Sequence, residues 1–194
     1  MKRILVIIGH PNKNSYCEAL ANAYSEGATQ KGHEVKMLPL HSIKFDLNLS
    51  AGYQQTQALA LEPDLIMAQE KITWANHIVI IHPVWWGSVP ALLKGFTDRV
   101  LLPGYAFKYR KDSPLWDKLL AGKTGRIIYT LDYPIWYYRF VLGAPAEKQL
   151  KKMTMEFCGI KPVQVNRFGP IRNSKPEQRN QWLNTSKEIG SNES

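Results

Sequence analysis

Two loops of this chain carry side chains that could bind a small molecule. The first, GHPNKNSYCEAL from residue 9, follows an apolar run and opens a helix. A helix N-terminus offers unpaired N–H groups and the positive end of the helix dipole, which together favour a phosphate. Ser15 adds a hydroxyl, Asn12 an amide and His10 an imidazole N–H. The alternative interpretation is an ordinary turn between strand and helix, in which Ser15 only caps the helix.

The second loop begins HPVWWGSVPALLKGF at residue 82 and places two adjacent tryptophans after a buried strand. Consecutive side chains of an extended backbone point to opposite sides, so Trp85 and Trp86 cannot both enter one core. At least one of them is therefore expected at a surface or against a ligand. A planar ligand needs such a wall, together with backbone N–H groups for its heteroatoms. The alternative is that both tryptophans cap the sheet as core residues.

Apolar runs and turn residues predict alternating strands and helices around these loops. Strands are expected at Arg3–Ile8, His33–Pro39, His77–His82, Lys123–Thr130 and 161–168. Helices are expected at about 16–31, 62–75, 89–101, 146–158 and 176–189. Residues 40–60 are expected to be irregular, with a candidate turn at Gly52.

This alternation predicts one α/β domain over residues 1–194, with a doubly wound parallel sheet and helices on both faces. An apolar fraction of 44% is enough for one core. Five strand–helix units fit the flavodoxin-like strand order 2-1-3-4-5. Ligands of such sheets bind at the carboxyl ends of the strands, where the order reverses between strands one and three. The two loops after Ile8 and Ile81 lie at this point.

The formal net charge of +9 is unevenly distributed. The first 93 residues carry seven basic and seven acidic residues, so the whole excess lies in the second half. Such a half favours anionic partners. The side chains of Lys148, Lys151 and Lys152 form a basic helix face, which is either only solvated or attracts a phosphorylated substrate.

Several classes of function find no support. The first loop has neither the G-x-x-x-x-G-K-[ST] nor the G-x-G-x-x-G spacing, so ATP or GTP hydrolysis is not indicated. No helix-turn-helix, zinc-finger or aromatic RNA-binding motif is present, and we expect no nucleic-acid partner. His77 and His82 have no partner at metal-ligand spacing, so no metal is expected.

The compartment is predicted from short-range features. Cys17 and Cys158 lie far apart and are expected to be reduced thiols. The apolar run Ile4–Ile8 is too short for a signal peptide, and no stretch approaches the roughly 20 apolar residues of a membrane span. We therefore expect a cytoplasmic protein that is not integral to a membrane.

The sequences GHPNKNSYCEAL and HPVWWGSVPALLKGFTDRVLLPGYAF resemble the flavodoxin-like NAD(P)H:quinone oxidoreductase family. This family includes two-electron quinone reductases and ancillary subunits of glutathione-gated potassium efflux systems. The second motif is the more specific one, and the resemblance spans almost the whole chain. It implies a bound flavin, FMN or FAD. The chain has no obvious extra segment for an adenine pocket, which favours FMN.

The resemblance also implies roles for individual residues. The flavin phosphate and ribityl chain would be lined by His10, Asn12, Ser15, Tyr16 and Cys17. The isoalloxazine ring would be edged by Pro83, Val84, Trp85, Trp86 and Gly87. Thr130 would provide a third edge. After Thr130 the chain departs from the family pattern, because Leu131 and Asp132 stand where small residues are usual.

An aromatic segment follows this third loop, with five aromatic residues at Tyr133, Trp136, Tyr137, Tyr138 and Phe140. It is either a lid over the flavin or a patch that packs against a second subunit. In the resembled family both hold, since the active site lies at a homodimer interface. Tyr137 is the candidate catalytic donor of a hydrogen bond to the quinone oxygen.

The expected activity is a ping-pong oxidoreduction, in which NAD(P)H gives hydride to the flavin and a quinone-like electrophile then takes both electrons. The choice between NADH and NADPH stays open. The alternative function is that of an ancillary regulatory flavoprotein docked on a membrane transporter, which a basic surface would suit. A one-electron carrier is disfavoured by the positive charge.

Overall fold

A computed structural model describes residues 1–50, 52 and 60–193. Its main sheet has the strand order β2-β1-β3-β6-β7, and all neighbouring strands are parallel. The strands are β1 (Arg3–Ile8), β2 (Glu34–Pro39), β3 (His77–Pro83), β6 (Thr124–Thr130) and β7 (Val163–Phe168). This is the predicted order 2-1-3-4-5, so the flavodoxin-like doubly wound fold is confirmed.

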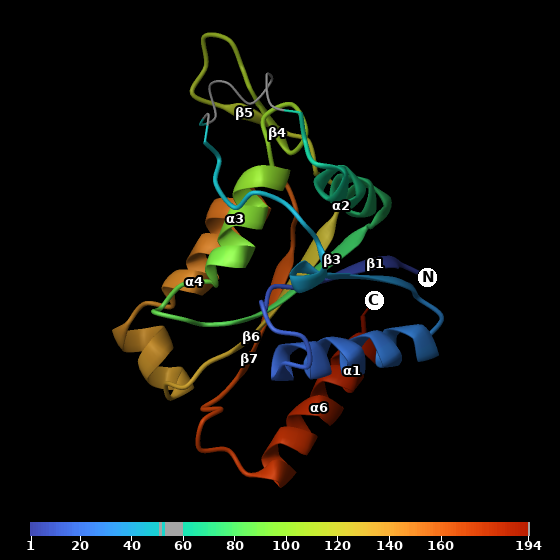
Figure 1. The fold of residues 1–194 in the computed structure, drawn as a ribbon, viewed down its shortest axis with the longest axis vertical. Helices are drawn as coiled ribbons and strands as arrows, with labels where there is room; N and C mark the ends of the chain where they lie inside the picture. Colours follow the sequence, from blue (N-terminus) through green and yellow to red (C-terminus); the bar gives the residue numbers. More distant parts are fainter. Residues whose placement is uncertain (51, 53–59, 194) are drawn as a thin grey trace.

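Helices cover both faces of the sheet (Figure 1). One face carries α1 (Tyr16–Gln30) and α6 (Pro176–Ser191), which lie side by side. The other carries α2 (Pro63–Trp74), α3 (Ala91–Val100) and the helical segment 145–158. Every residue of β3 is buried, as expected for a central strand with helices on both sides.

The last predicted helix before β7 has an unexpected geometry. Residues 146–158 are helical as predicted. The helical segment begins at Pro145 and divides into α4 (Pro145–Lys148), the π-helix η4 (Gln149–Met155) and α5 (Glu156–Cys158). A second π-helix, η3 (Tyr137–Val141), occupies the aromatic segment. Single π-helical turns are rare and concentrate at functional sites.

A small antiparallel hairpin, β4 (Phe107–Tyr109) and β5 (Trp116–Lys118), was not predicted. A short 3₁₀ turn, η1 (Leu40–Ser42), follows β2. The N–H of Gly52 donates to the Leu49 carbonyl over 2.9 Å, in agreement with the candidate turn there. Residues 51 and 53–59 lie outside the described residues.

Both cysteines are free and buried, as expected for reduced thiols. Within the described ranges, no helix is long and apolar enough to cross a bilayer. The same residues contain no group of three or more His, Cys, Asp or Glu side chains that could hold a metal ion.

Candidate active site

A cavity of about 190 Å³ lies at the carboxyl ends of β1, β3 and β6, at the predicted switch point. It is formed by the last residues of β3 and β6, the loops after β1, β3 and β6, the first turn of α1 and one residue from the loop after β7. The lining residues are His10, Tyr16, Cys17, Pro83, Val84, Trp85, Thr130, Leu131, Asp132 and Ile171.

Ser15 caps α1, and its hydroxyl accepts a hydrogen bond from the Glu18 N–H over 3.3 Å. In return the Glu18 carboxylate accepts from the Asn14 N–H over 2.6 Å. These contacts resemble a capping box and fix the entry of the chain into α1. Within the described structure, the N–H groups of Tyr16 and Cys17 make no hydrogen bond. They are the unpaired donors that a helix N-terminus offers to an anion.

His10 is held in one tautomer. Its Nδ1 accepts a hydrogen bond from the Asn12 N–H over 3.0 Å, so in the neutral ring Nε2 carries the proton. Burial lowers the pKa of His10, which favours this neutral form. The ring meets Trp85 edge to face, with 5.4 Å between the ring centroids. The cavity therefore contains an oriented, uncharged N–H donor.

Two protonated side chains form the inner wall. Burial raises the pKa of Cys17 to about 12, and its Sγ lies 3.6 Å from the Thr130 hydroxyl. Burial also raises the pKa of Tyr16 to about 12, and its hydroxyl donates to the Arg179 carbonyl over 2.8 Å. Cys17 is thus a neutral thiol and not a thiolate nucleophile at neutral pH.

The loop after β3 forms a tight two-residue turn, which we call the tryptophan turn (Trp85–Ser88). The N–H and carbonyl of Trp85 exchange hydrogen bonds of 3.0 and 2.9 Å with Ser88. The expectation that the two tryptophans share an extended backbone is wrong, because Trp86 and Gly87 both have positive φ, 51° and 73°. The prediction that at least one leaves the core is confirmed, since Trp85 is 44% exposed and Trp86 fully exposed.

The loop after β6 is tied to the loops on either side of it. The Thr130 carbonyl accepts from the Val84 N–H over 2.7 Å, and the Leu131 carbonyl accepts from the Ile171 N–H over 3.0 Å. Asp132 accepts from the Arg172 N–H over 2.8 Å. The larger residues after Thr130 are thus accommodated: Leu131 turns its side chain inward, where it is buried.

The structure brings together seven of the predicted site residues in this cavity: His10, Tyr16, Cys17, Pro83, Val84, Trp85 and Thr130. The others do not line it. Asn12, Ser15, Trp86 and Gly87 lie in the loops that border it, and Tyr137 lies half-buried in η3 against Tyr133 and Trp136.

Ile171 was not predicted. It belongs to the loop after the fifth strand, which reaches the same edge of a parallel sheet, and strand position was the available signal. In the aromatic segment, Tyr138 is fully buried and therefore is not part of an exposed lid.

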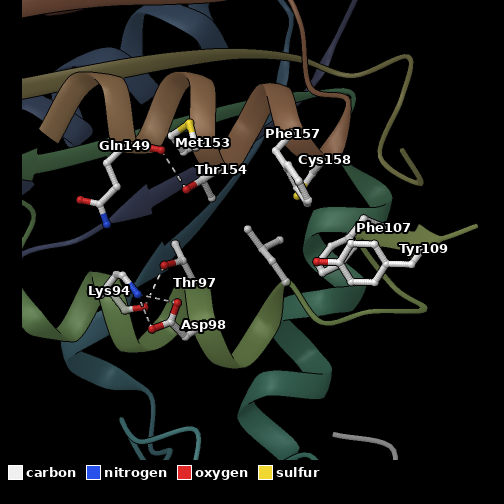
Figure 2. A pocket seen from close by; sticks show the side chains of 11 residues that line it. Lys94, Thr97, Asp98, Phe107, Tyr109, Gln149, Met153, Thr154, Phe157 and Cys158 are labelled. Carbon is white, nitrogen blue, oxygen red and sulfur yellow. Dashed lines mark hydrogen bonds and ion pairs between the residues drawn. The ribbon is translucent and has the colours of Figure 1, made fainter. Parts of the chain in front are cut away.

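A second cavity, of about 310 Å³, lies between α3 and the helical segment 149–158 (Figure 2). Figure 2 shows the Lys94–Asp98 ion pair of α3 on one side and Gln149 and Thr154 on the other. Phe107, Tyr109 and Phe157 also line it. None of the predicted site residues does, so the smaller cavity at the switch point is the candidate active site.

Comparison with known proteins shows the family of this chain. The family model for the flavodoxin-like fold matches residues 2–188. The chain is 32% identical to NAD(P)H dehydrogenase [quinone] 1 of Cavia porcellus, over 94% of this chain and 74% of that protein. The chain belongs to the flavodoxin-like NAD(P)H:quinone oxidoreductase family. The expected enzyme class, an NAD(P)H dehydrogenase of the quinone type, is confirmed at the level of this family.

Solved structures show the same fold. A Streptococcus mutans protein superposes with a TM-score of 0.84 at 29% identity, covering 98% of this chain and 99% of that one. An FMN-dependent NADH-azoreductase of Bacillus anthracis, solved in complex with FMN, gives a TM-score of 0.71 at 20% identity and covers 97% and 98%. At that identity the second likeness shows the fold alone.

Proposed function

We propose that this family member is a flavin-dependent NAD(P)H oxidoreductase that reduces quinones or similar electrophiles by two electrons. The cavity at the carboxyl ends of β1, β3 and β6 carries the proposal, because it combines a helix N-terminus with a wall from the tryptophan turn. The name of the Cavia porcellus relative supports the substrate class. The Bacillus anthracis structure supports a flavin in this fold.

The side chains and free N–H groups fit a flavin, with FMN favoured over FAD. The unpaired N–H groups of Tyr16 and Cys17 suit its phosphate, and the Nε2–H of His10 suits a nearby oxygen. The N–H groups of Trp86 and Gly87 also make no hydrogen bond among the described residues, and they suit the polar edge of the ring. A bound flavin would supply acceptance of a hydride and return of two electrons.

The residues that line the cavity would orient the flavin and shield it from water. Pro83, Val84 and Leu131 give the cavity an apolar wall that excludes water from the reacting centre. Cys17 and Tyr16 stay protonated and add no negative charge beside an anionic cofactor.

We propose that NAD(P)H and the electron acceptor occupy the same cavity in turn, which gives ping-pong kinetics.

We further propose a homodimer in which a second copy closes the active site. Trp86, Phe140 and Met153 are exposed apolar side chains. Gln149 connects the tryptophan turn to the second cavity, because it lines that cavity and accepts a hydrogen bond from Ser88 over 3.2 Å. Sedimentation velocity is expected to give a dimer that Met153→Glu weakens. A monomer at micromolar concentration would contradict this arrangement.

We also propose a cytoplasmic location, because two free and buried cysteines suit a reducing compartment.

The function itself is tested by reconstituting the purified protein with FMN or FAD and following oxidation of NADH and NADPH with a quinone. We expect flavin-dependent turnover with parallel double-reciprocal plots. No flavin binding and no turnover with either nucleotide would overturn the proposal.

A further inference from the structure

Tyr138 of the aromatic segment and Ala146 of α4 hold the tryptophan turn by hydrogen bonds. The Gly87 carbonyl accepts two hydrogen bonds, from the Ala146 N–H over 3.1 Å and from the Tyr138 hydroxyl over 3.2 Å. The Ala146 N–H also reaches the Tyr138 oxygen, 3.1 Å away. Tyr138 and Ala146 therefore hold one carbonyl of the turn together.

This clamp fixes the orientation of a whole peptide unit. The carbonyl of the Gly87–Ser88 peptide points to Tyr138 and Ala146, and its N–H donates to the Trp85 carbonyl over 2.9 Å. A planar peptide held at both polar ends cannot rotate. The turn needs such support because Trp86 adopts a positive φ that side chains other than glycine's rarely take.

Tyr138 is itself rigidly placed. Its side chain is fully buried, and its ring packs edge to face on Tyr129 at 5.9 Å. The Tyr129 hydroxyl donates to Glu147 over 3.0 Å, and Arg167 donates to both. Burial raises the pKa of Tyr138, so its hydroxyl keeps the proton that it donates to Gly87.

We infer that Tyr138 is a positioning residue that presents the tryptophan turn to the flavin ring. The inference rests on the proposed function, and it separates Tyr138 from the exposed aromatic residues around it. The unpaired N–H groups of Trp86 and Gly87 belong to the two peptide units that lie between Trp85 and the clamped Gly87–Ser88 peptide. Because Trp85 and Ser88 also exchange two hydrogen bonds, these two units are held at both ends in the ligand-free chain. A preorganised turn costs less to order when a ligand binds.

The test replaces one hydroxyl and keeps the ring. Tyr138→Phe is expected to weaken FMN binding by about 3- to 10-fold, the range of one hydrogen bond, measured by quenching of flavin fluorescence on titration of apoprotein. The matched control is Tyr24→Phe, which removes another buried hydroxyl at the opposite end of the sheet, bonded to Glu193. That variant is expected to lose stability but to keep the affinity for FMN.

A ligand-free measurement makes the inference independent of the cofactor. Amide hydrogen exchange at Trp85 and Ser88 is expected to be several-fold faster in Tyr138→Phe than in wild type, and unchanged in Tyr24→Phe. If wild type binds neither FMN nor FAD, the proposed function fails and exchange alone decides the role of Tyr138. Equal exchange at the turn in Tyr138→Phe and wild type would overturn the inference, as would equal FMN affinity.

Discussion

At the scale of single residues, the site depends on neutral donors whose protons are held by burial and by local backbone contacts. His10 shows this most clearly, since its Nδ1 accepts a hydrogen bond from the Asn12 N–H and the proton of the neutral ring is therefore on Nε2. No charge is needed there, because the helix N-terminus already supplies a favourable potential for an anion.

Replacement of His10 by Phe keeps a ring against Trp85 but removes the N–H donor. We expect FMN affinity to fall by about 10-fold, since one hydrogen bond to a charged or polar partner is worth about 1.5 kcal/mol. The same replacement at His33, which accepts a hydrogen bond from the Lys2 N–H, is the control. Titration of both apoproteins measures the difference, and an equal loss in both would show a nonspecific effect.

The buried thiols give a second residue-scale prediction. Cys17 is 2% exposed and its pKa is raised to about 12, so it should resist alkylation at pH 8 in the folded protein. Mass spectrometry after iodoacetamide treatment is expected to show no modification of Cys17 in native protein and full modification in urea. Rapid labelling of the native protein would contradict this burial.

At the scale of elements, the residues that follow α6 are bound to the amino ends of the strands through Glu193. Glu193 is buried and accepts hydrogen bonds from Arg126 over 2.7 Å and Tyr24 over 3.0 Å. His77 Nε2 lies 3.4 Å from the Glu193 carboxylate without a hydrogen bond. Burial opposes ionisation of Glu193, but the contacts with Arg126 outweigh it and hold the pKa below its usual value.

This cluster predicts how stability depends on pH. Burial lowers the pKa of His77 to about 4, so unfolded protein binds a proton from about pH 6.5 downward while folded protein does not. Glu193 has a lowered pKa, and its contribution is lost as the pH falls through that value. Both effects have the same sign, and the urea midpoint is expected to fall steadily from pH 7 to pH 4.

Glu193→Gln tests the same cluster directly. It leaves Arg126 buried without a carboxylate and should cost about 2 kcal/mol at pH 7. Below pH 4.5 the difference from wild type should shrink. Glu188→Gln, at an exposed position in the last turns of α6, is expected to change stability little. Urea unfolding of both variants is the measurement, and equal effects would contradict a lock at Glu193.

The elements also show how far sequence patterns reach. Strands with continuous apolar runs, such as Ile4–Ile8, were predicted nearly to the residue, and they located the cavity through strand order alone. The hairpin of β4 and β5 was not predicted, because a strand of three residues is too short to show an alternation of apolar and polar side chains. The burial of Tyr138 escaped as well, because in a π-helix the inward face does not follow the usual helical period.

At the scale of the whole molecule, the excess charge of +9 lies in the second half of the chain, whereas the loop that offers N–H groups to a cofactor phosphate follows β1 in the neutral first half. A field of this kind attracts an anionic substrate over distances that salt screens. We expect kcat/KM for NADPH to fall severalfold between about 20 and about 300 mM salt, with little release of flavin. Stopped-flow reduction measures the reaction with NADPH, and gel filtration at each salt concentration measures flavin release. Equal salt sensitivity of the two would contradict a role of the charge in attracting NADPH.

We propose above all that the loops after β1, β3 and β6 hold a flavin. The most direct test is the visible absorption spectrum of the purified protein, with mass spectrometry of the cofactor released on denaturation. We expect flavin bands, with FMN as the released molecule, and their loss on anaerobic addition of NAD(P)H. A colourless protein that stays colourless after incubation with FMN and FAD would contradict it.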